Sequence, residues 1–204
     1  MDSQSGKDLN HLLAQAKQGQ DDALGRLLEL YRNYVKLLAD LQINRRLQGK
    51  VSASDIVQET FLQAKRAFTQ FRGTSEGELV VWLRQILASQ LAMMFRHYST
   101  QKRDIHLEHQ LDEELNRSSQ ALGFSLVSEQ ASPSQNAIRR EQSVLLADAL
   151  ARIAADYREV IVLRHLEGMS FPDVAQRMGR SLPSVKNMWT RAISKLRDTL
   201  GELS

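Results

Sequence analysis

The sequence predicts an all-α protein made of two small helical domains joined by a flexible acidic linker, the C-terminal domain being a helix-turn-helix. Its 204 residues include only three prolines and ten glycines, a composition that favours helices throughout. The net charge of +3 is unevenly distributed: it is +5 over residues 1–103, −5 over 104–138 and +3 over 139–204. Two basic segments separated by an acidic one predict two domains that face nucleic acid, with a tether between them.

The composition also excludes several classes of protein. There is no cysteine, so disulfides, thiol redox switches and cysteine-based zinc sites are ruled out. No apolar run approaches about 18 residues, and the N-terminus lacks the apolar segment of a secretory signal. We therefore expect a soluble, cytoplasmic protein with no membrane insertion and no cofactor.

Capping signals near the C-terminus predict two short helices joined by a tight turn. Ser170 can cap the first helix, and Asp173, three residues further on, completes a capping box. Gly179 ends this helix, and Ser181 caps the next one, which has Pro183 in its first turn. A helix, a turn and a helix in this order form the motif that places its second helix in a major groove of DNA.

The second of these helices separates its side chains by character. At about 100° per residue, its apolar side chains fall on one face and its polar side chains on the other. Six basic residues and no acidic one occur from Val174 to Arg197. Such a helix can hold phosphates and reach base edges, although a solvated basic helix in an ordinary bundle is the alternative. The polar face comprises Lys186, Asn187, Thr190, Arg191, Ser194 and Arg197.

A helix expected over residues 55–71 carries a second face of interest. Its buried side is rich in apolar residues, and Leu62 lies on the opposite side among acidic and amide groups. An apolar anchor with a polar rim is typical of a protein-docking surface, but a single exposed leucine is also common without any function. The residues on this side are Asp55, Gln58, Glu59, Leu62 and Arg66.

Three motifs in this order resemble a bacterial RNA polymerase sigma factor of the short, extracytoplasmic-function (ECF) type. They are DIVQETFLQA at residues 55–64, FRGTSEGELVVWLRQILASQLA at residues 71–92, and the C-terminal helix-turn-helix. The resemblance assigns residues 1–103 to sigma region 2, 104–138 to a linker and 139–204 to sigma region 4. It implies a non-enzymatic subunit that binds core RNA polymerase, directs it to specific promoters and supports initiation by promoter recognition and strand opening.

The resemblance also implies roles for single residues. Polymerase binding, through the β′ clamp helices, falls to Asp55, Gln58, Glu59 and Leu62. Recognition and opening of the minus-ten element fall to Phe71, Arg72, Trp82, Gln85, Ser89, Arg96, Lys102 and Arg103. Reading of the minus-thirty-five element falls to Lys186, Asn187, Thr190, Arg191 and Ser194. The implied partners are core RNA polymerase, contacted at the β′ clamp helices and the β flap, and promoter DNA, with an anti-sigma factor left open.

The chain departs from the family pattern at several positions. Ser89 stands where many relatives have Asn, so the identity of the base captured there does not carry over. Met188 and Ile193 occupy positions that are often basic, which predicts fewer phosphate contacts. Arg180 replaces a residue that is usually apolar. For Trp82, packing in the core is the alternative to contact with DNA.

Two other classes of function remain open at this point. A free-standing regulator of the LuxR type would carry a similar helix-turn-helix, but residues 1–103 lack the alternating strands of a receiver and a phosphate-accepting site. An enzyme acting on nucleic acid would need a triad, a phosphate loop or a metal-spaced carboxylate cluster, and none is evident. His106 and His109 have a spacing that some metal sites use, but without a third ligand a solvated loop is the better interpretation. We therefore expect no catalytic residue and no metal site.

Overall fold

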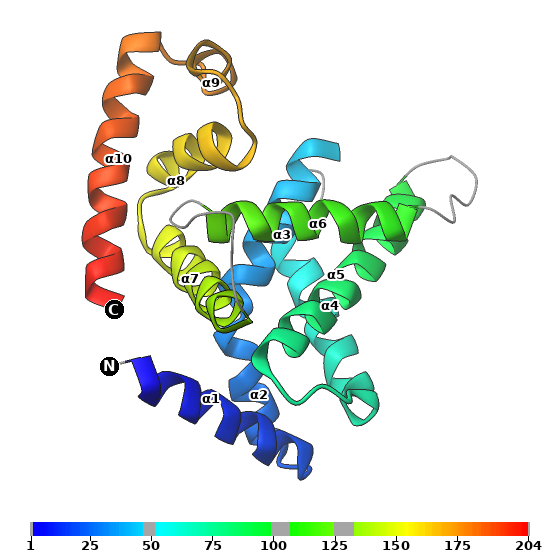
Figure 1. The fold of residues 1–204 in the computed structure, drawn as a ribbon. Coiled ribbons are helices and arrows are strands. Elements are labelled where there is room, and N and C mark those ends of the chain that lie inside the picture. The colour runs from blue at the N-terminus through cyan, green and yellow to red at the C-terminus, as the bar shows by residue number, and fades with distance from the viewer. Residues whose placement is uncertain (1, 47–51, 99–106, 125–132, 204) are drawn as a thin grey trace.

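The computed structural model describes residues 2–46, 52–98, 107–124 and 133–203, and within these ranges every regular element is a helix. The predicted all-α class is therefore confirmed. Figure 1 shows the N-terminal helices packed in one bundle and the C-terminal helices beside them. In chain order the elements are α1 (Asp2–Lys17), α2 (Asp21–Leu30), α3 (Arg32–Arg46), α4 (Ala53–Ala67), the 3-10 turn η1 (Phe68–Gln70), α5 (Glu76–Tyr98), α6 (Leu107–Phe124), α7 (Pro133–Arg152), α8 (Ala155–Ile161), the π-helical turn η2 (Val162–Leu166), α9 (Phe171–Arg177) and α10 (Leu182–Leu203).

Helix α5 runs through the core of the N-terminal bundle. Its residues Leu79, Leu83, Leu87 and Leu91 recur at every fourth position, and all four are fully buried. This spacing places them on one face of the helix, where each contributes about 1.5–3 kcal/mol on burial. By length and composition alone, α5 is the one described helix that could cross a membrane, but half of its apolar stretch is buried in the bundle. Its apolar character is accounted for by this core position.

The start of α5 is fixed by a capping box. The Ser75 Oγ accepts a hydrogen bond from the Glu78 backbone N–H at 3.4 Å. In return, Glu78 Oε2 accepts from the Ser75 and Thr74 backbone N–H groups at 3.0 and 2.8 Å. These hydrogen bonds to the charged form lower the pKa of the Glu78 carboxyl. The cap satisfies backbone donors that a helix start leaves unpaired, and it sets where α5 leaves the preceding loop.

The segment predicted as a flexible linker, with a short helix expected near residues 109–115, contains a longer packed helix. Helix α6 covers most of the described part of residues 104–138 and packs against α5 and α3. Its residues Leu111 and Leu115 are fully buried. Flexibility of the linker is therefore not confirmed, because α6 supplies apolar side chains to the N-terminal core while it exposes Glu108, Glu113 and Arg117.

The C-terminal helices pack directly on the N-terminal bundle. Helix α7 contacts α3 and α6. The Asn33 Nδ2 of α3 donates a hydrogen bond of 2.8 Å to Asp148 Oδ1 of α7. At the next residue of α3, the hydroxyls of Tyr34 and Ser119 are 2.6 Å apart and hydrogen-bonded, which ties α3 to α6. The two predicted domains share an interface in this structure.

The predicted caps of the helix-turn-helix are confirmed. The Asp173 backbone N–H donates to Ser170 Oγ at 3.4 Å at the start of α9. Gly179 follows the end of α9 with φ of 62°, a left-handed conformation that costs glycine little. The Ser184 N–H donates to Ser181 Oγ at 3.4 Å at the start of α10. Local sequence signals therefore set both helix starts and the turn between them.

Candidate polymerase and DNA interfaces

The predicted docking residues lie together on the solvent side of α4. Ser52 caps the start of the helix, and its Oγ accepts from the Ser54 N–H at 3.2 Å. Leu62 is 42% exposed on the side of the helix opposite its buried face. The surface we call the α4 face consists of the exposed residues Asp55, Gln58, Glu59 and Leu62. It has the composition of a small apolar anchor within an acidic and amide rim.

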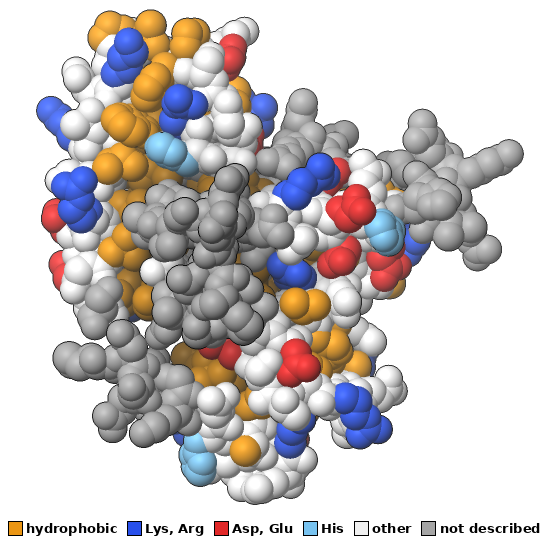
Figure 2. Space-filling view, viewed as in Figure 1, with side chains coloured by type: hydrophobic (Ala, Val, Ile, Leu, Met, Phe, Trp, Pro, Cys, Tyr) orange, Lys and Arg blue, Asp and Glu red, His pale blue; other side chains and the backbone are white. Residues whose placement is uncertain are grey.

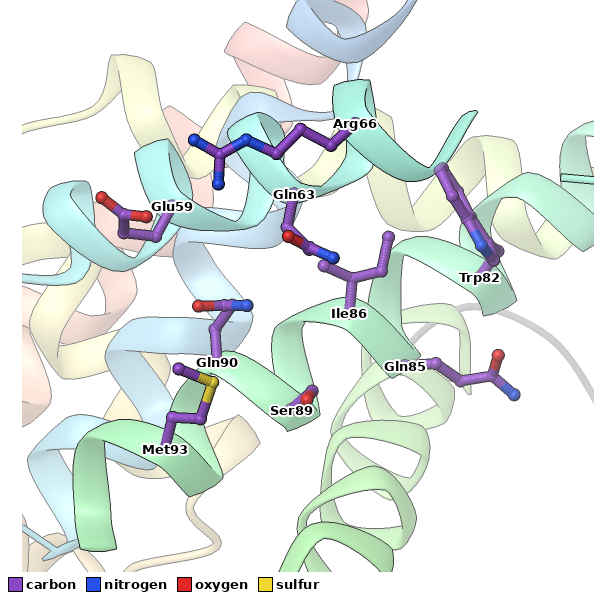
Figure 3. A pocket seen from close by; sticks show the side chains of 9 residues that line it. All are labelled: Glu59, Gln63, Arg66, Trp82, Gln85, Ile86, Ser89, Gln90 and Met93. Carbon is purple, nitrogen blue, oxygen red and sulfur yellow. The ribbon is translucent and has the colours of Figure 1, made fainter. Parts of the chain in front are cut away.

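An open groove of about 450 Å³ lies along the junction of α4 and α5 (Figure 3). It joins the α4 face to the predicted minus-ten residues, because Glu59 lines it together with Trp82, Gln85 and Ser89. The lining residues from α4 are Glu59, Gln63 and Arg66. Those from α5 are Trp82, Gln85, Ile86, Ser89, Gln90 and Met93.

The groove combines apolar and amide side chains. Trp82 stands at one end, Ile86 near the middle and Met93 at the other end, and Met93 is 55% exposed. The amides of Gln63 on α4 and Gln90 on α5 extend into the space between the two helices. Apolar side chains beside hydrogen-bonding amides are the features that proteins use to hold a planar, polar heterocycle.

Four groove residues were not predicted to belong to an interface: Gln63, Ile86, Gln90 and Met93. Gln63 lies one turn after Glu59, and Gln90 and Met93 continue the stripe that begins at Trp82. Helical spacing from the motif residues would have found them. The sequence does not show that α4 packs beside α5. This packing joins the lining residues of the two helices into one groove.

Phe71 occupies a different place from the one predicted. It is only 7% exposed and does not line the groove. Its ring lies 5.0 Å from that of Trp82 and 5.7 Å from that of Phe68, measured between ring centroids. Phe71 therefore supports one side of Trp82, and a direct contact of its ring with DNA is not what this structure presents. Trp82 packs on these rings and also lines the groove, so its contact with DNA stays a prediction.

Gly73 is required for this packing. A Cβ atom at that position would overlap the Phe71 ring and lie only 2.7 Å from the Glu78 Cβ. The loop that carries the exposed Arg72 is thus pressed against the Phe71 ring.

The remaining predicted minus-ten residues lie farther along the chain. Arg96 is half-buried on the last turns of α5 and does not line the groove. Lys102 and Arg103 lie outside the described residues, as does His106.

The predicted reading helix has the expected two faces. In α10, Val185, Ala192 and Leu196 are buried against the rest of the C-terminal unit. The opposite face is formed by Lys186, Asn187, Thr190, Arg191 and Ser194, all of them exposed. In Figure 2 the C-terminal helices form the upper left part of the molecule, where Lys and Arg side chains are spread out with hydrophobic side chains between them. The Thr190 Oγ1 donates to the Lys186 carbonyl at 3.1 Å, so its lone pairs remain directed outward.

Trp189 fixes α10 against the turn η2. Its ring stacks on that of His165 with centroids 5.9 Å apart, and it meets the Phe171 ring edge-on at 5.6 Å. Burial, with a smaller effect of the neighbouring Arg164, lowers the pKa of the His165 imidazole. The rotation of the reading helix is therefore set by an aromatic contact that reaches two other elements.

Arg180, the departure in the turn, has a structural role. Its guanidinium forms an ion pair with Asp156 at the start of α8. The ion pair connects the turn of the helix-turn-helix to the supporting helix. It also offsets the charge of Arg180, so this arginine is a poor candidate for a phosphate contact.

No group of three or more Asp, Glu or His side chains that could hold a metal ion occurs in the part of the chain that the structure describes. The imidazole Nδ1 of His109 lies 3.6 Å from Glu113 Oε1 on the exposed side of α6.

Comparison with known proteins shows that this chain is similar to RNA polymerase sigma factors. Residues 143–196 match the family described as Sigma-70, region 4, which lies within the predicted C-terminal domain. The ECF RNA polymerase sigma factor BldN of Streptomyces coelicolor is 29% identical over 96% of this chain and 66% of its own length. The RNA polymerase sigma factor CarQ of Myxococcus xanthus is 29% identical over 78% of this chain and 80% of its own.

Further relatives extend the same finding. The ECF RNA polymerase sigma-E factor of Haemophilus influenzae is 26% identical over 89% of both chains. A solved chain from the RsbN-BldN complex matches 91% of this chain at 22% identity, with a TM-score of 0.33, too low for the two folds to be compared. The chain spans slightly less than two thirds of BldN but most of the other two relatives. The resemblance seen in the motifs is confirmed: the chain is a relative of the RNA polymerase sigma factors of the extracytoplasmic-function type.

Proposed function

We propose that this chain is a sigma factor that binds core RNA polymerase, directs it to specific promoters and supports strand opening, with no catalytic role of its own. The observation that carries the proposal is the junction of the α4 face with the groove. Glu59 belongs to both, so a polymerase bound to α4 would lie beside any DNA held between α4 and α5. A free-standing DNA-binding regulator has no need for this arrangement.

The proposal divides the chain into three parts. Residues 1–103 act as region 2, which docks to the β′ clamp helices through Asp55, Gln58, Glu59 and Leu62 and meets the minus-ten element. Residues 139–204 act as region 4, which meets the β flap and reads the minus-thirty-five element. Residues 104–138 connect them. An anti-sigma factor is the regulatory partner proposed, and the bacterial cytoplasm, with the nucleoid during transcription, is the proposed location.

The residues assigned to the minus-ten element divide into those that line the groove and those that do not. Trp82, Gln85 and Ser89 line the groove, and we assign them to the opened strand. Arg72 and Arg96, with Lys102 and Arg103, supply positive charge for the backbone around it. For the minus-thirty-five element, Lys186, Asn187, Thr190, Arg191 and Ser194 form the exposed face that enters the duplex groove.

The test is co-purification with core RNA polymerase followed by run-off transcription on genomic fragments. Glu59→Arg and Leu62→Ala should each weaken binding to polymerase without loss of helix content, because both side chains face solvent and support no core. Glu159→Arg, which alters an exposed acid on α8, is the matched control and should bind normally. Full binding by the α4 variants would remove the docking assignment.

A further inference from the structure

No predicted interface residue lies in α1, yet this helix ends beside the aromatic residues that support the groove. The Nζ of Lys17, the last residue of α1, lies 5.6 Å from the centroid of the Phe71 ring. Phe71 in turn contacts Trp82, with 5.0 Å between the ring centroids, and Trp82 lines the groove. A series of direct contacts therefore connects the end of α1 to the groove.

Lys17 brings a positive charge without an acidic partner to this end of the groove. Its side chain is exposed, and none of the ion pairs between described residues includes it. Asp21, four residues further along the chain, is engaged instead by Lys65 of α4, whose Nζ lies 3.2 Å from the Asp21 Oδ2. Arg72, which follows Phe71 directly, is also exposed. Two cations from distant parts of the sequence thus lie next to Phe71.

A phosphate group supplies what Lys17 lacks. At an exposed position a cation is held only weakly over an aromatic ring, and the Lys17 ammonium has no hydrogen bond to another described residue. Its three N–H donors can bind phosphate oxygens. Proteins hold single strands of nucleic acid with aromatic surfaces for the bases and basic side chains for the backbone. Here Trp82 offers the aromatic surface, and Lys17 with Arg72 offers the basic side chains.

We propose that Lys17 binds a backbone phosphate of the opened promoter strand where this strand passes Trp82, so that α1 forms part of the DNA-binding surface. The inference rests on the proposed function, in which α5 meets a melted strand. It goes beyond that function because it assigns a DNA contact to a helix outside the three sequence motifs. The alternative is that Lys17 only packs on the Phe71 ring.

The experiment measures the affinity of polymerase holoenzyme for a promoter fragment that is pre-melted from the minus-ten element to the start site. The promoter is one obtained by run-off transcription with the unaltered chain, and affinity is measured by filter binding at several salt concentrations. Each phosphate contact to a single strand contributes about 0.7 to the slope of log affinity against log salt concentration. In Lys17→Cys the slope should be smaller by about this amount, so a rise in salt of about four-fold should cost the variant about 2.6-fold less affinity than it costs the unaltered chain.

The charge can then be restored chemically, because the sequence contains no cysteine and the new thiol is unique in the chain. Treatment with 2-bromoethylamine, before assembly with core polymerase, joins an aminoethyl group to the sulfur and gives a side chain of the length of lysine with an ammonium at its end. Treated Lys17→Cys should recover the slope of the unaltered chain. Lys36→Cys is the matched control and should keep the full slope with or without treatment, since Asp40 already engages the Lys36 ammonium at 2.7 Å.

The slope separates a phosphate contact from a structural role. Loss of packing on Phe71 would weaken binding equally at every salt concentration, so an unchanged slope in Lys17→Cys overturns the inference even if the affinity falls. An equal decrease in Lys36→Cys, or no recovery after treatment, overturns it as well.

The same experiment separates this inference from the proposed function. If the holoenzyme forms and transcribes but the slope is unchanged in Lys17→Cys, the sigma factor proposal stands and only the contact of Lys17 is removed. If the unaltered chain forms no holoenzyme, the proposed function is overturned, and the contact of Lys17 with it.

Discussion

The indole Nε1 of Trp189 donates a hydrogen bond of 2.9 Å to Nε2 of His165, and this bond joins the reading helix α10 to the π-helical turn before α9. The bond requires His165 to be neutral with its proton on Nδ1, because Nε2 must accept. A π-helical turn at this position is consistent with a functional site, since such turns often occur there.

The first prediction concerns pH. Because the pKa of His165 is lowered in the folded state, the unfolded chain binds this proton more readily. The contribution of His165 to stability is therefore present above its ordinary pKa of 6.5 and is lost as pH falls through the lower folded value. In His165→Gln the amide oxygen can accept from Trp189 without titrating, so its melting temperature should fall less between pH 8 and pH 5.

The measurement is the melting temperature of the unaltered chain and of His165→Gln between pH 8 and pH 5, followed by circular dichroism. All other titrating groups are common to the two proteins, so their effects cancel in the difference. Parallel pH profiles would show that the hydrogen bond does not depend on the charge of His165.

The second prediction concerns the loop before α5. Gly73→Ala should lower the free energy of unfolding by about 1–3 kcal/mol, because the new methyl group would overlap the Phe71 ring and the Glu78 Cβ. Gly25→Ala is the matched control, since a Cβ there meets nothing within 4 Å. It should stabilise helix α2 by about 0.5–1 kcal/mol. Urea unfolding measures the free energy of unfolding of both variants. If Gly73→Ala leaves it unchanged, the loop is free to move away from Phe71.

The third prediction tests the packing of α6. Leu115→Ala should cost about 2–5 kcal/mol in the free energy of unfolding, because Leu115 is fully buried. Arg117→Ala, at an exposed position on the same helix, should stay within about 0.5 kcal/mol. Equal, small effects in urea unfolding would restore the view of this segment as a plain tether.

The acidic linker shows why the sequence was only partly informative. Capping residues such as Ser170 and Ser181 act within a few positions, so the sequence alone located their helices. Leu111 and Leu115 are two apolar residues in an acidic segment, and their burial depends on α3 and α5, which are distant in the sequence. Because the segment is acidic overall, its average composition does not show that Leu111 and Leu115 lie on one buried face of a helix.

The candidate site, too, was predictable only where neighbouring residues in the sequence determine the structure. The exposed face of α4 and the two faces of α10 were predictable, because helical periodicity alone separates their side chains. Three features depend on tertiary contacts and could not be foreseen: the burial of Phe71, the ion pair of Arg180 with Asp156, and the groove between Gln63 and Gln90.

The fourth prediction separates two arginines of the helix-turn-helix. Arg191→Ala should weaken binding of polymerase holoenzyme to duplex promoter DNA, since Arg191 is exposed on the reading face. Loss of a base contact would cost about 1–3 kcal/mol, and loss of a phosphate contact would lower the salt slope by about one. Arg180→Ala should change neither quantity, because Asp156 already engages its guanidinium. Filter binding at several salt concentrations measures both, and equal effects would place Arg180 at the DNA.

The central claim is that the C-terminal unit reads duplex DNA while the groove beside α4 holds an opened strand. Its most direct test is open-complex formation by core polymerase with this chain, followed with a fluorescent base on duplex and pre-melted promoters. Arg191→Ala should fail on both templates when recruitment depends on the upstream element. Trp82→Ala, checked for retained helix content, should fail on duplex DNA and recover in part on the pre-melted template. Identical responses of the two variants, or opening by core polymerase without the chain, would contradict the account.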